Sequence, residues 1–435
     1  MPLRATVSRS QFRADCVTRR IIFHNASQVV TCTGPARGRR GAEMADASTR
    51  RNVAIAVDGA RIASVGAPDD IERAYPGAER VDCAGRVVTP GLVDSHTHAI
   101  FGRPRYDEQE LRAAGAGYME IAEQGGGIHS SVRDLRARSE DDLLALARTR
   151  LPRLARYGAT TIEIKSGYGL SVDDELKSLR VIARLQAETP LRLVPTWLGG
   201  HEIPREFRER ANGRQKYIDQ LIHEQLPRVV TERLATFADV FCEPGVFTLK
   251  ETRTILAAAR SKGLMLKLHA DELEPCGGAE LAAELGAISA DHLAAISPAG
   301  IGALAQSGTV ATLLPGTMLF LGRTRQAPAR ELISAGAVVA LATDFNPGTS
   351  PTPNLPLIMT LGVSQLHMSV AEVVLATTVN AAAALGLAES TGQIAPGFSA
   401  DLALWDCEDV REIPYWYGDA RCAASWCRGE SVYLA

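Results

Sequence analysis

Between residues 91 and 344, short apolar segments alternate eight times with longer amphipathic, helix-like segments. This alternation is typical of parallel β/α units, and eight such units can close into a barrel. The sequence therefore predicts an α/β fold of the (β/α)8 TIM barrel type. The expected strands cover 91–98, 160–167, 192–200, 238–243, 264–271, 287–292, 309–315 and 337–344.

The two flanks of this region carry a different pattern, in which strand-like runs and turns dominate. In the N-terminal flank no helix is expected, and Asp58 and Gly59 after an alternating run favour a hairpin. Because short strands need neighbours to be stable, we expect both flanks to form one small β-sandwich domain rather than two separate appendages. The expected division is 1–19 as a disordered extension, 20–88 and 387–435 as the two parts of the β-sandwich domain, and 89–386 as the barrel.

The composition is that of an ordinary globular protein. Charged residues make up 22% of the chain and the net charge is −3, so nothing indicates a nucleic-acid partner. No run of about 18 apolar residues occurs, which argues against a membrane span. The eight cysteines include no C-x-x-C pair and no secretory signal precedes them, which favours reduced thiols in the cytoplasm.

Polar residues gather at the carboxyl ends of the expected strands, where barrel enzymes have their active sites. A single histidine at a strand end is more often a hydrogen-bonded structural residue than a ligand, but here several histidines share one rim. Apolar strands that end in histidine or aspartate therefore indicate a functional site. The residues concerned are His96, His98, Lys165, His201, Glu243, His269, Asp271, Asp291, His292 and Asp344.

His96 and His98 lie two residues apart at the end of the first strand, so their side chains project on the same side. His269 on strand 5 and Asp344 on strand 8 would complete a set of neutral imidazoles and one carboxylate. This set suits one zinc or iron ion, with a position left open for water. Such a metal lowers the pKa of its bound water toward about 7 and so supplies hydroxide at neutral pH.

Attack on a carbonyl also needs a group that moves protons, and two residues are candidates. Glu272, just beyond strand 5, could turn toward a substrate, and His292 at the end of strand 6 could reach the attacked carbonyl. Either could be the base. On spacing alone, Glu272 could equally be a carboxylate that stabilises a helix N-terminus, whereas the strand-end position of His292 favours a role in catalysis.

An ordered set of motifs resembles the amidohydrolase superfamily and, more closely, the imidazolonepropionases of histidine degradation. With a similar order of small β segments in the flanks, the resemblance covers nearly the whole chain beyond the first twenty residues. It implies a metal-dependent hydrolase that acts on carbon–nitrogen bonds in cyclic amides. The motifs are "VVTPGLVDSHTH", "HTHAIFGRPR", "KSGYGL", "LGGHEIP", "DVFCEPGVF", "KLHADE", "GGAELAAELGAISADHL", "LPGTMLFLG" and "ALATDFNPG".

The resemblance also implies roles for individual residues. By that similarity, the ligands of one Zn²⁺ or Fe³⁺ ion per subunit are His96, His98, His269 and Asp344. The residues that transfer protons or act near the attacked carbonyl are Glu272, His292 and Asp344. The residues that contact substrate or product are Arg105, Tyr168, His201, Glu272, Asn346, Gly348 and Thr349.

Taken singly, most of the substrate-contacting residues have a simpler interpretation. Arg105 could form a surface salt bridge, although its guanidinium fork suits the carboxylate of a propionate group. Tyr168 could anchor a loop, and His201 could be a histidine at the edge of the core. Asn346 and Gly348 suit a turn irrespective of any ligand.

Many members of the superfamily hold two metals bridged by a carboxylated lysine on strand 4. The strand count places Lys165 on strand 2, whereas strand 4 ends in Cys242 and Glu243. The bridging lysine is therefore missing, and we expect a mononuclear site.

The resemblance implies hydrolysis of the cyclic amide of 4-imidazolone-5-propanoate to N-formimidoyl-L-glutamate by a metal-bound hydroxide. The metal and a protonated His292 would stabilise the oxyanion, while Glu272 would pass the water proton to the departing ring nitrogen. The nearest alternative is an aminohydrolase that deaminates a guanine- or cytosine-like ring, and a more distant one is a scaffold without catalysis. We also expect a homodimer, which is common among such barrels.

Overall fold

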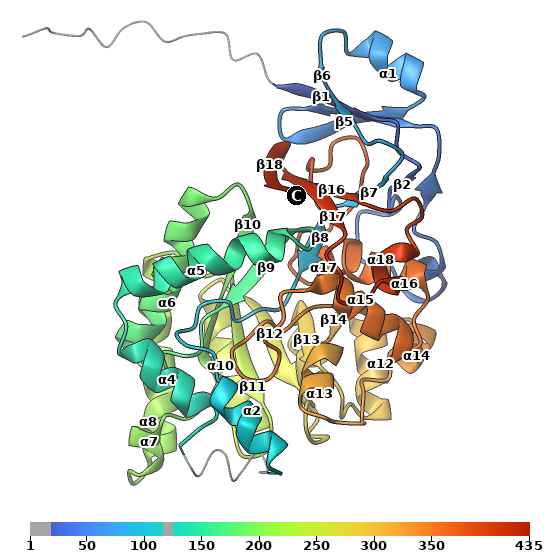
Figure 1. The fold of residues 1–435 in the computed structure, drawn as a ribbon. Helices are drawn as coiled ribbons and strands as arrows, with labels where there is room; N and C mark the ends of the chain where they lie inside the picture. Colours follow the sequence, from blue (N-terminus) through green and yellow to red (C-terminus); the bar gives the residue numbers. More distant parts are fainter. Residues whose placement is uncertain (1–18, 116–124) are drawn as a thin grey trace, which may run out of the picture.

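The computed structural model describes residues 19–115 and 125–435, and it places the eight expected strands in one parallel sheet (Figure 1). Neighbours in this sheet follow sequence order, and a parallel bridge between Thr97 and Phe345 joins its two ends into a closed barrel. The predicted barrel is confirmed. Its strands are β8 (Leu92–Asp94), β9 (Ala159–Lys165), β10 (Arg192–Gly200), β11 (Phe237–Cys242), β12 (Met265–Ala270), β13 (Ser289–His292), β14 (Val310–Leu313) and β15 (Val338–Leu341).

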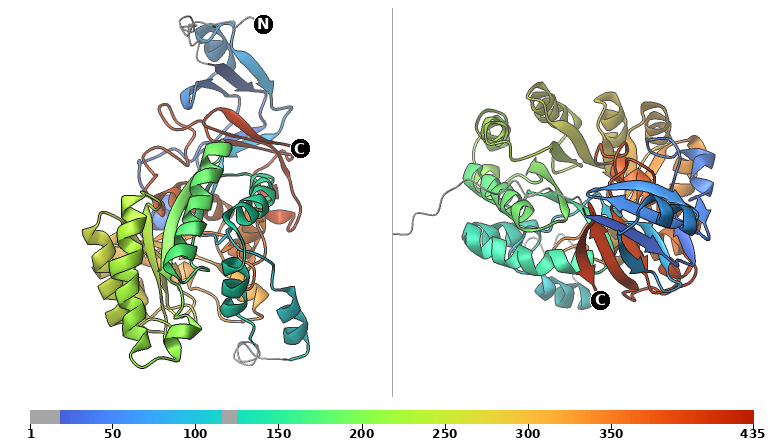
Figure 2. Two further views of the ribbon diagram at one scale, coloured as in Figure 1. Left: turned by 90° about the vertical axis from the view of Figure 1, so that its left-hand side faces the viewer. Right: turned by 90° about the horizontal axis from the view of Figure 1, so that it is seen from above.

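Helices surround this sheet on its outer side, as the view from above shows (Figure 2). Several begin at capping residues, such as Ser139, Ser171 and Thr248, whose side chains accept backbone N–H groups of the first turn. No helix in the described ranges combines the length and apolar character needed to cross a bilayer. The main ones are α2 (Tyr106–Ala113), α4 (Ile128–Arg136), α5 (Glu140–Ala155), α6 (Val172–Glu188), α8 (Gly213–Gln220), α10 (Leu249–Ser261), α11 (Gly278–Glu284), α12 (Pro298–Ser307), α13 (Pro315–Phe320), α14 (Ala329–Ala335), α15 (Leu355–Ser364), α16 (Val370–Ala376) and α17 (Val379–Ala383). A π-helix (Leu221–Gln225) joins α8 to α9 (Leu226–Thr231), and the short α7 (Arg205–Arg208) precedes them.

Both chain ends contribute to a small β domain, as predicted. One sheet has the order β18-β17-β16-β7-β2-β3 and therefore joins C-terminal to N-terminal strands, while a second has the order β5-β4-β1-β6. The two sheets share an apolar core, in which the rings of Phe23 and Trp426 meet edge to face at 4.8 Å. The strands are β1 (Arg20–His24), β2 (Gln28–Val30), β3 (Thr49–Arg50), β4 (Ala54–Asp58), β5 (Arg61–Gly66), β6 (Glu79–Asp82), β7 (Val87–Pro90), β16 (Leu402–Trp405), β17 (Cys422–Cys427) and β18 (Glu430–Leu434).

The N-terminal flank departs from expectation in one respect. Strands β4 and β5 form the predicted hairpin, but the helix α1 (Pro68–Ala74) follows them where no helix was expected. Pro68 at its first turn, two aspartates in that turn and the buried Ile71 are ordinary helix-start signals that a reading for strands passes over. The flanks also contain a 3-10 turn (Gly41–Ala45) and the short α18 (Glu412–Tyr415). The expected extension 1–19 falls, apart from Arg19, outside the described residues.

Candidate metal centre and active site

The ends of β8 and β15 meet at the carboxyl rim of the barrel. Beyond β8 the chain runs beside the segment that follows β15, where the amide of Asp344 donates to the carbonyl of His96 at 3.0 Å. The carboxylate of Asp94 accepts from the amide and the hydroxyl of Thr343, at 3.0 and 2.6 Å. These bonds fix the segment that carries the His96-x-His98 pair next to Asp344.

The four predicted metal ligands lie together at this rim, and all four side chains are buried. Within the described residues, the groups that could hold a metal are three overlapping triplets: His96, His98 and Asp344; His98, His201 and His269; and His96, His269 and His292. The Nε2 atoms of His96 and His98 lie 3.3 Å apart, and each lies 3.5 Å from Oδ1 of Asp344. His269 places its own Nε2 at 3.5 Å from Nε2 of His98. Three imidazole nitrogens and one carboxylate oxygen at these separations are a donor set that fits zinc or iron.

Protonation states within the described site agree with that fit. Burial holds the pKa values of His96 and His98 well below the usual range of histidine, so both rings are neutral at physiological pH. A metal ligand must offer a lone pair, which a neutral imidazole does. Thr317 donates a hydrogen bond of 2.6 Å to Oδ2 of Asp344 and so orients the carboxylate with its other oxygen toward the histidines.

The two candidate proton-transfer residues lie together beside this set. Nδ1 of His292 is 3.5 Å from Oε2 of Glu272, and the ring centroid of His292 is 5.2 Å from that of His269. Burial, reinforced by the carboxylates of Asp344 and Glu243, holds the pKa of Glu272 well above its usual range. His292 has a φ of 79°, a left-handed conformation that costs energy for a residue with a Cβ atom and that is concentrated at functional sites.

Arg105 lies against the loop that follows β15. The backbone of Arg105 donates to the carbonyl of Pro347 at 3.0 Å, and its side chain is 7% exposed. At Gly348 a Cβ atom would stand 1.3 Å from Nη2 of Arg105, so the guanidinium packs on the backbone of that glycine. A second cation, Arg112, donates to the carbonyl of Gly348 at 3.1 Å. The buried carboxylate of Glu108 lies 3.6 Å from Nε of Arg105 and 3.4 Å from Nη2 of Arg112. The wall next to the segment that provides Asp344 thus holds two cations and one anion.

Tyr168 and His201 form an aromatic wall beside His98. The rings of His98 and His201 stack at 5.1 Å with an interplanar angle of 16°, and Tyr168 lies 5.4 Å from His201. His201 Nδ1 lies 2.9 Å from the carbonyl oxygen of Gly167 and donates to it, which leaves Nε2 as an acceptor. Burial lowers the pKa of His201 to about 3, so this ring is neutral as well.

The side chain of Asn346 is engaged within its own loop. Its amide group donates to the carbonyl of Asp344 at 2.7 Å and to the hydroxyl of Thr349 at 2.8 Å. Its Oδ1 accepts from the amides of Gly348 and Thr349 at 2.8 and 2.7 Å. These bonds are those expected if Asn346 stabilises a turn. They hold the loop against which Arg105 packs.

Two polar strand-end residues serve local structure instead. Glu243 accepts the amides of Glu272 and Glu274, at 3.1 and 2.8 Å, and thereby positions the backbone of Glu272. Asp271 accepts four successive amides, those of residues 276–279, at the start of α11. Neither carboxylate is among the groups that could hold a metal within the described residues.

The structure also confirms the strand positions on which the absence of a bridging lysine depends. β11, the fourth strand, ends in Cys242 and offers no lysine, whereas Lys165 closes the second strand, β9. The ammonium of Lys165 is ion-paired with Asp239 at 2.7 Å and with Glu163 at 2.8 Å. Its ammonium is therefore held by carboxylates in the barrel interior and does not bridge two metals.

Two carboxylates contact the ligand histidines from inside the barrel; the sequence placed Asp291 at the rim without giving it a role, and it missed Asp239. Oδ2 of Asp291 is 2.7 Å from Nδ1 of His96, and Oδ2 of Asp239 is 3.0 Å from Nδ1 of His269. The available signal was a charged residue inside an otherwise apolar strand, as in "ADVFC", because such a residue must find a partner inside the barrel.

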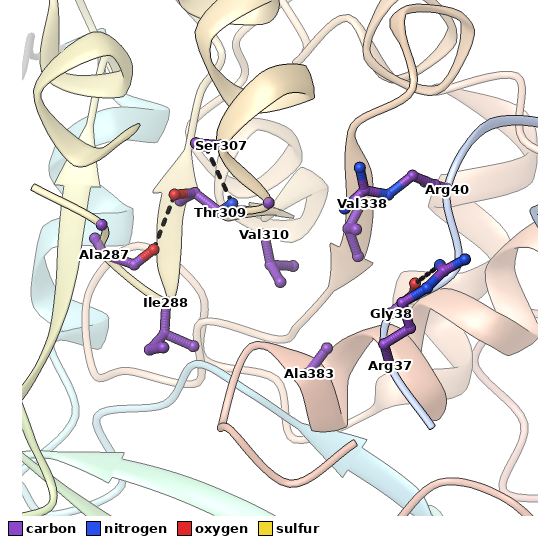
Figure 3. A pocket seen from close by; sticks show the side chains of 12 residues that line it. Arg37, Gly38, Arg40, Ala287, Ile288, Ser307, Thr309, Val310, Val338 and Ala383 are labelled. Carbon is purple, nitrogen blue, oxygen red and sulfur yellow. Dashed lines mark hydrogen bonds between the residues drawn. The ribbon is translucent and has the colours of Figure 1, made fainter. Parts of the chain in front are cut away.

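A separate cavity of about 260 Å³ opens at the opposite end of the barrel (Figure 3). It lies at the amino ends of β13, β14 and β15 and is therefore remote from the rim at which barrel enzymes act. Arg37, which borders it, is neutralised by Glu43 at 2.7 Å. The cavity is lined by Arg37, Gly38, Arg40, Gly286, Ala287, Ile288, Ser307, Gly308, Thr309, Val310, Val338 and Ala383.

Comparison with known proteins identifies the family. The sequence model of the amidohydrolase family matches residues 108–433. The imidazolonepropionase of Solibacter usitatus is 45% identical over 416 residues, which are 94% of this chain and 97% of that protein. That of Bacillus velezensis is 46% identical over 399 residues, 91% of this chain and 93% of that protein. This chain belongs to the imidazolonepropionase family of amidohydrolases.

Solved structures of distant relatives agree with the fold of this imidazolonepropionase family member. The Escherichia coli guanine deaminase superposes with a TM-score of 0.74 at 12% identity, covering 96% of this chain and 99% of that one. An adenosine deaminase from Xanthomonas campestris with bound zinc gives a TM-score of 0.70 at 16% identity, covering 95% and 93%. At such low identity the likeness concerns the fold alone.

Proposed function

We propose that this chain is an imidazolonepropionase that hydrolyses the cyclic amide of 4-imidazolone-5-propanoate to N-formimidoyl-L-glutamate. Relatives with that name match more than nine tenths of the chain at 45% and 46% identity. The observation that carries the proposal is the convergence of His96, His98, His269 and Asp344 at the carboxyl rim of the barrel. Arg105 provides a cationic group beside the strand of Asp344, where a substrate carboxylate can be bound.

The metal would be held by the three imidazoles and Asp344, and we propose zinc or iron as its identity. When bound there, either ion polarises a carbonyl group and makes water available as a nucleophile near neutral pH. Thr317 supports this arrangement because its hydroxyl occupies the second oxygen of Asp344. With no lysine on β11, we propose that one metal is bound per subunit.

Substrate recognition is assigned to the walls of the site. The guanidinium of Arg105 can bind the propionate carboxylate through two parallel hydrogen bonds. Tyr168 and His201 present ring faces to the flat imidazolone, and Nε2 of His201 can accept a hydrogen bond from a ring N–H group. Asn346 already accepts the amides of Gly348 and Thr349, so the group left to contact the substrate at Thr349 is its hydroxyl, which accepts from Asn346 and can still donate. Gly348 would contribute through the packing of Arg105 on its backbone.

Proton transfer is assigned to Glu272, with His292 and Asp344 in support. The carboxylate of Glu272 takes a proton from the attacking water as the new carbon–oxygen bond forms. It returns this proton to the ring nitrogen as the carbon–nitrogen bond breaks, so that the nitrogen departs as part of a neutral formimidoyl (amidine) group. The expected imidazolium at His292 is not retained, because burial holds the pKa of His292 well below its usual range and the ring is neutral. We propose instead that the neutral ring, 3.5 Å from Glu272, stabilises the negative charge on the carbonyl oxygen by donating an N–H hydrogen bond.

The direct test is incubation of metal-loaded protein with freshly prepared 4-imidazolone-5-propanoate while the ultraviolet absorbance of the substrate is followed. We expect the absorbance to fall without release of ammonia. 4-Imidazolone-5-propanoate has no exocyclic amino group, so ammonia released from guanine or cytosine in parallel assays, with this substrate left intact, would indicate the aminohydrolase alternative. Activity confined to another cyclic amide would overturn the substrate assignment while leaving the fold intact.

We further propose a reducing, cytoplasmic location and a homodimeric state. The described cysteines all carry free thiols, which is the usual state of cysteines in the cytoplasm. Analytical ultracentrifugation tests the dimer, and a sedimentation coefficient corresponding to a 46.5 kDa monomer would contradict it. The cysteines concerned are Cys32, Cys83, Cys242, Cys276, Cys407, Cys422 and Cys427.

A further inference from the structure

Five charged side chains occupy the interior of the barrel directly beneath the candidate metal site. Their side chains are fully excluded from solvent, and they come from four different strands. The interior of a barrel is normally filled by branched apolar side chains, so a charged layer at this depth needs a physical reason. The five residues are Glu163 and Lys165 on β9, Asp239 on β11, Lys267 on β12 and Asp291 on β13.

Lys165 is the hub of this buried charge layer. Its ammonium lies 2.7 Å from Asp239, 2.8 Å from Glu163 and 3.6 Å from Asp291. Burial alone would favour the neutral amine, but the three carboxylates outweigh burial and hold the pKa of Lys165 above its usual range. Lys165 is therefore a permanent cation.

Lys267 adds a second cation on the other side of the layer. Its ammonium donates to the carbonyl of Ser95 at 2.9 Å and lies 3.3 Å from Glu163 and 3.9 Å from Asp291. Ser95 immediately precedes His96, so Lys267 also holds the backbone that carries this ligand. Two ammonium groups facing three carboxylates leave one negative charge beneath the metal site.

Two carboxylates of this layer also contact histidines that are proposed as metal ligands. Asp291 contacts Nδ1 of His96 at 2.7 Å, and Asp239 contacts Nδ1 of His269 at 3.0 Å. Because a carboxylate only accepts hydrogen bonds, the ring of His96 must carry its proton on Nδ1 and present the lone pair of Nε2. The contact at His269 is within ion-pair distance but lacks hydrogen-bond geometry, and Asp239 accepts the backbone amide of His269 at 3.2 Å. Nε2 of His96 lies 3.5 Å from Oδ1 of Asp344, and Nε2 of His269 lies 3.5 Å from Nε2 of His98.

Stability alone does not account for this layer. The cost of removing charges from water can exceed the attraction between them, so a buried ion pair is weak evidence for a stabilising role. Apolar residues of similar volume would fill the same space. The layer is explained, in contrast, if its carboxylates must stay ionised and fixed in direction.

We propose that Asp291 and Asp239 are positioning residues for the metal, and that Lys165 and Lys267 hold them in place. Asp291 fixes the tautomer and direction of His96, Asp239 holds the backbone and faces the ring of His269, and their negative charge strengthens the imidazoles as donors. The lysines compensate the buried carboxylates and leave them no freedom to turn away. This inference rests on the metal site proposed above.

The test compares zinc affinity, measured by competition with a chelator, in wild-type protein and in Asp291→Asn. The amide keeps the size of the side chain and can still accept the hydrogen bond of His96, but it carries no charge. Loss of such a carboxylate weakens metal binding by roughly 10- to 100-fold in known sites, and we expect a loss in this range. The visible spectrum of the cobalt-substituted variant should also shift relative to wild type.

Asp401→Asn is the matched control. Asp401 is another buried carboxylate in an ion pair, 2.8 Å from Arg192, but it lies in the β domain and contacts no histidine. We expect this variant to lose thermal stability and to keep wild-type zinc affinity. A folded Asp291→Asn protein with unchanged zinc affinity, or an equal loss in Asp401→Asn, would overturn the proposal.

A measurement on the wild-type protein covers the case in which Asp291→Asn fails to fold. In cobalt-substituted protein, N–H protons on metal-bound imidazoles give strongly shifted proton resonances. The proposal requires at least two that exchange slowly with solvent, from Nδ1 of His96 and of His269. Fewer than two would contradict it. Failure of the wild-type protein to bind zinc or cobalt would instead refute the underlying metal site.

Discussion

Burial shifts the pKa values of several residues on which the proposed chemistry depends. It holds the pKa values of His96 and His98 far below neutrality and so keeps both rings available as ligands. The same burial, with Asp344 and Glu243 nearby, raises the pKa of Glu272. A carboxyl group with a raised pKa both accepts and releases a proton readily, as an acid–base catalyst must.

Glu272→Gln should separate catalysis from stability. Without the proton carrier, we expect turnover to fall about 10²- to 10⁴-fold. A raised pKa in the folded state means that folding favours the protonated carboxyl, so Glu272 costs stability as pH rises above the unfolded value of about 4.3. At pH 8 the metal-free Glu272→Gln variant should therefore melt at a higher temperature than metal-free wild-type protein. This difference in melting temperature should shrink toward pH 4. A lower melting temperature at pH 8 would count against the assignment.

Arg105→Met tests recognition of the substrate carboxylate. A hydrogen bond to a charged group contributes about 1.5–3 kcal/mol, so we expect KM to rise roughly 10- to 100-fold. Metal content should stay at the wild-type level because Arg105 contacts none of the ligands. Arg103→Met, which removes a half-exposed arginine paired with Asp107, is the control and should leave KM unchanged. Metal loss in Arg105→Met would refute this role.

At the level of elements, the segment after β15 connects the metal site to the substrate wall. Asp344 begins it, the bonds of Asn346 shape it, and Gly348 offers the flat surface on which Arg105 rests. A shift of this short loop would therefore displace the guanidinium relative to the ligands.

Gly348→Ala should reproduce part of the Arg105 effect. The added methyl group would overlap the guanidinium, which must move away. We expect a several-fold rise in KM with normal metal content, measured by steady-state kinetics and metal analysis. Gly302→Ala is the control, because its Cβ meets nothing within 4 Å and alanine favours the helix α12. Equal kinetics in both variants would show that the packing at Gly348 is irrelevant to binding.

The sequence predicts the barrel strands because each is a short, largely apolar run between helix-like segments. Apart from β14, the strands from β9 to β15 have a charged residue or a histidine at their last position or within the next three residues. The helix α1 was missed because its apolar content is small and it is packed on strands. The contact between Asp291 and His96 could not be predicted from the sequence, because the two residues are 195 positions apart and meet only when the barrel closes. Contacts across a closed barrel follow from topology rather than from local pattern.

For the whole molecule, the β domain supports the barrel at the end opposite the site (Figure 1). Trp405 packs on Gly158 just before β9, and Arg192 at the start of β10 pairs with Asp401 at 2.8 Å. Both contacts lie at the amino ends of barrel strands. The carboxyl rim, where the metal ligands converge, is left to the loops that would bind substrate.

The most direct measurement of the proposed activity is turnover of 4-imidazolone-5-propanoate in water enriched in ¹⁸O, with the product analysed by mass spectrometry. We expect N-formimidoyl-L-glutamate that carries one heavy oxygen, located in the newly formed carboxylate, and no ammonia. An intact substrate, or a product whose ring stays closed whether or not its carbonyl oxygen has exchanged, would contradict hydrolysis of the cyclic amide.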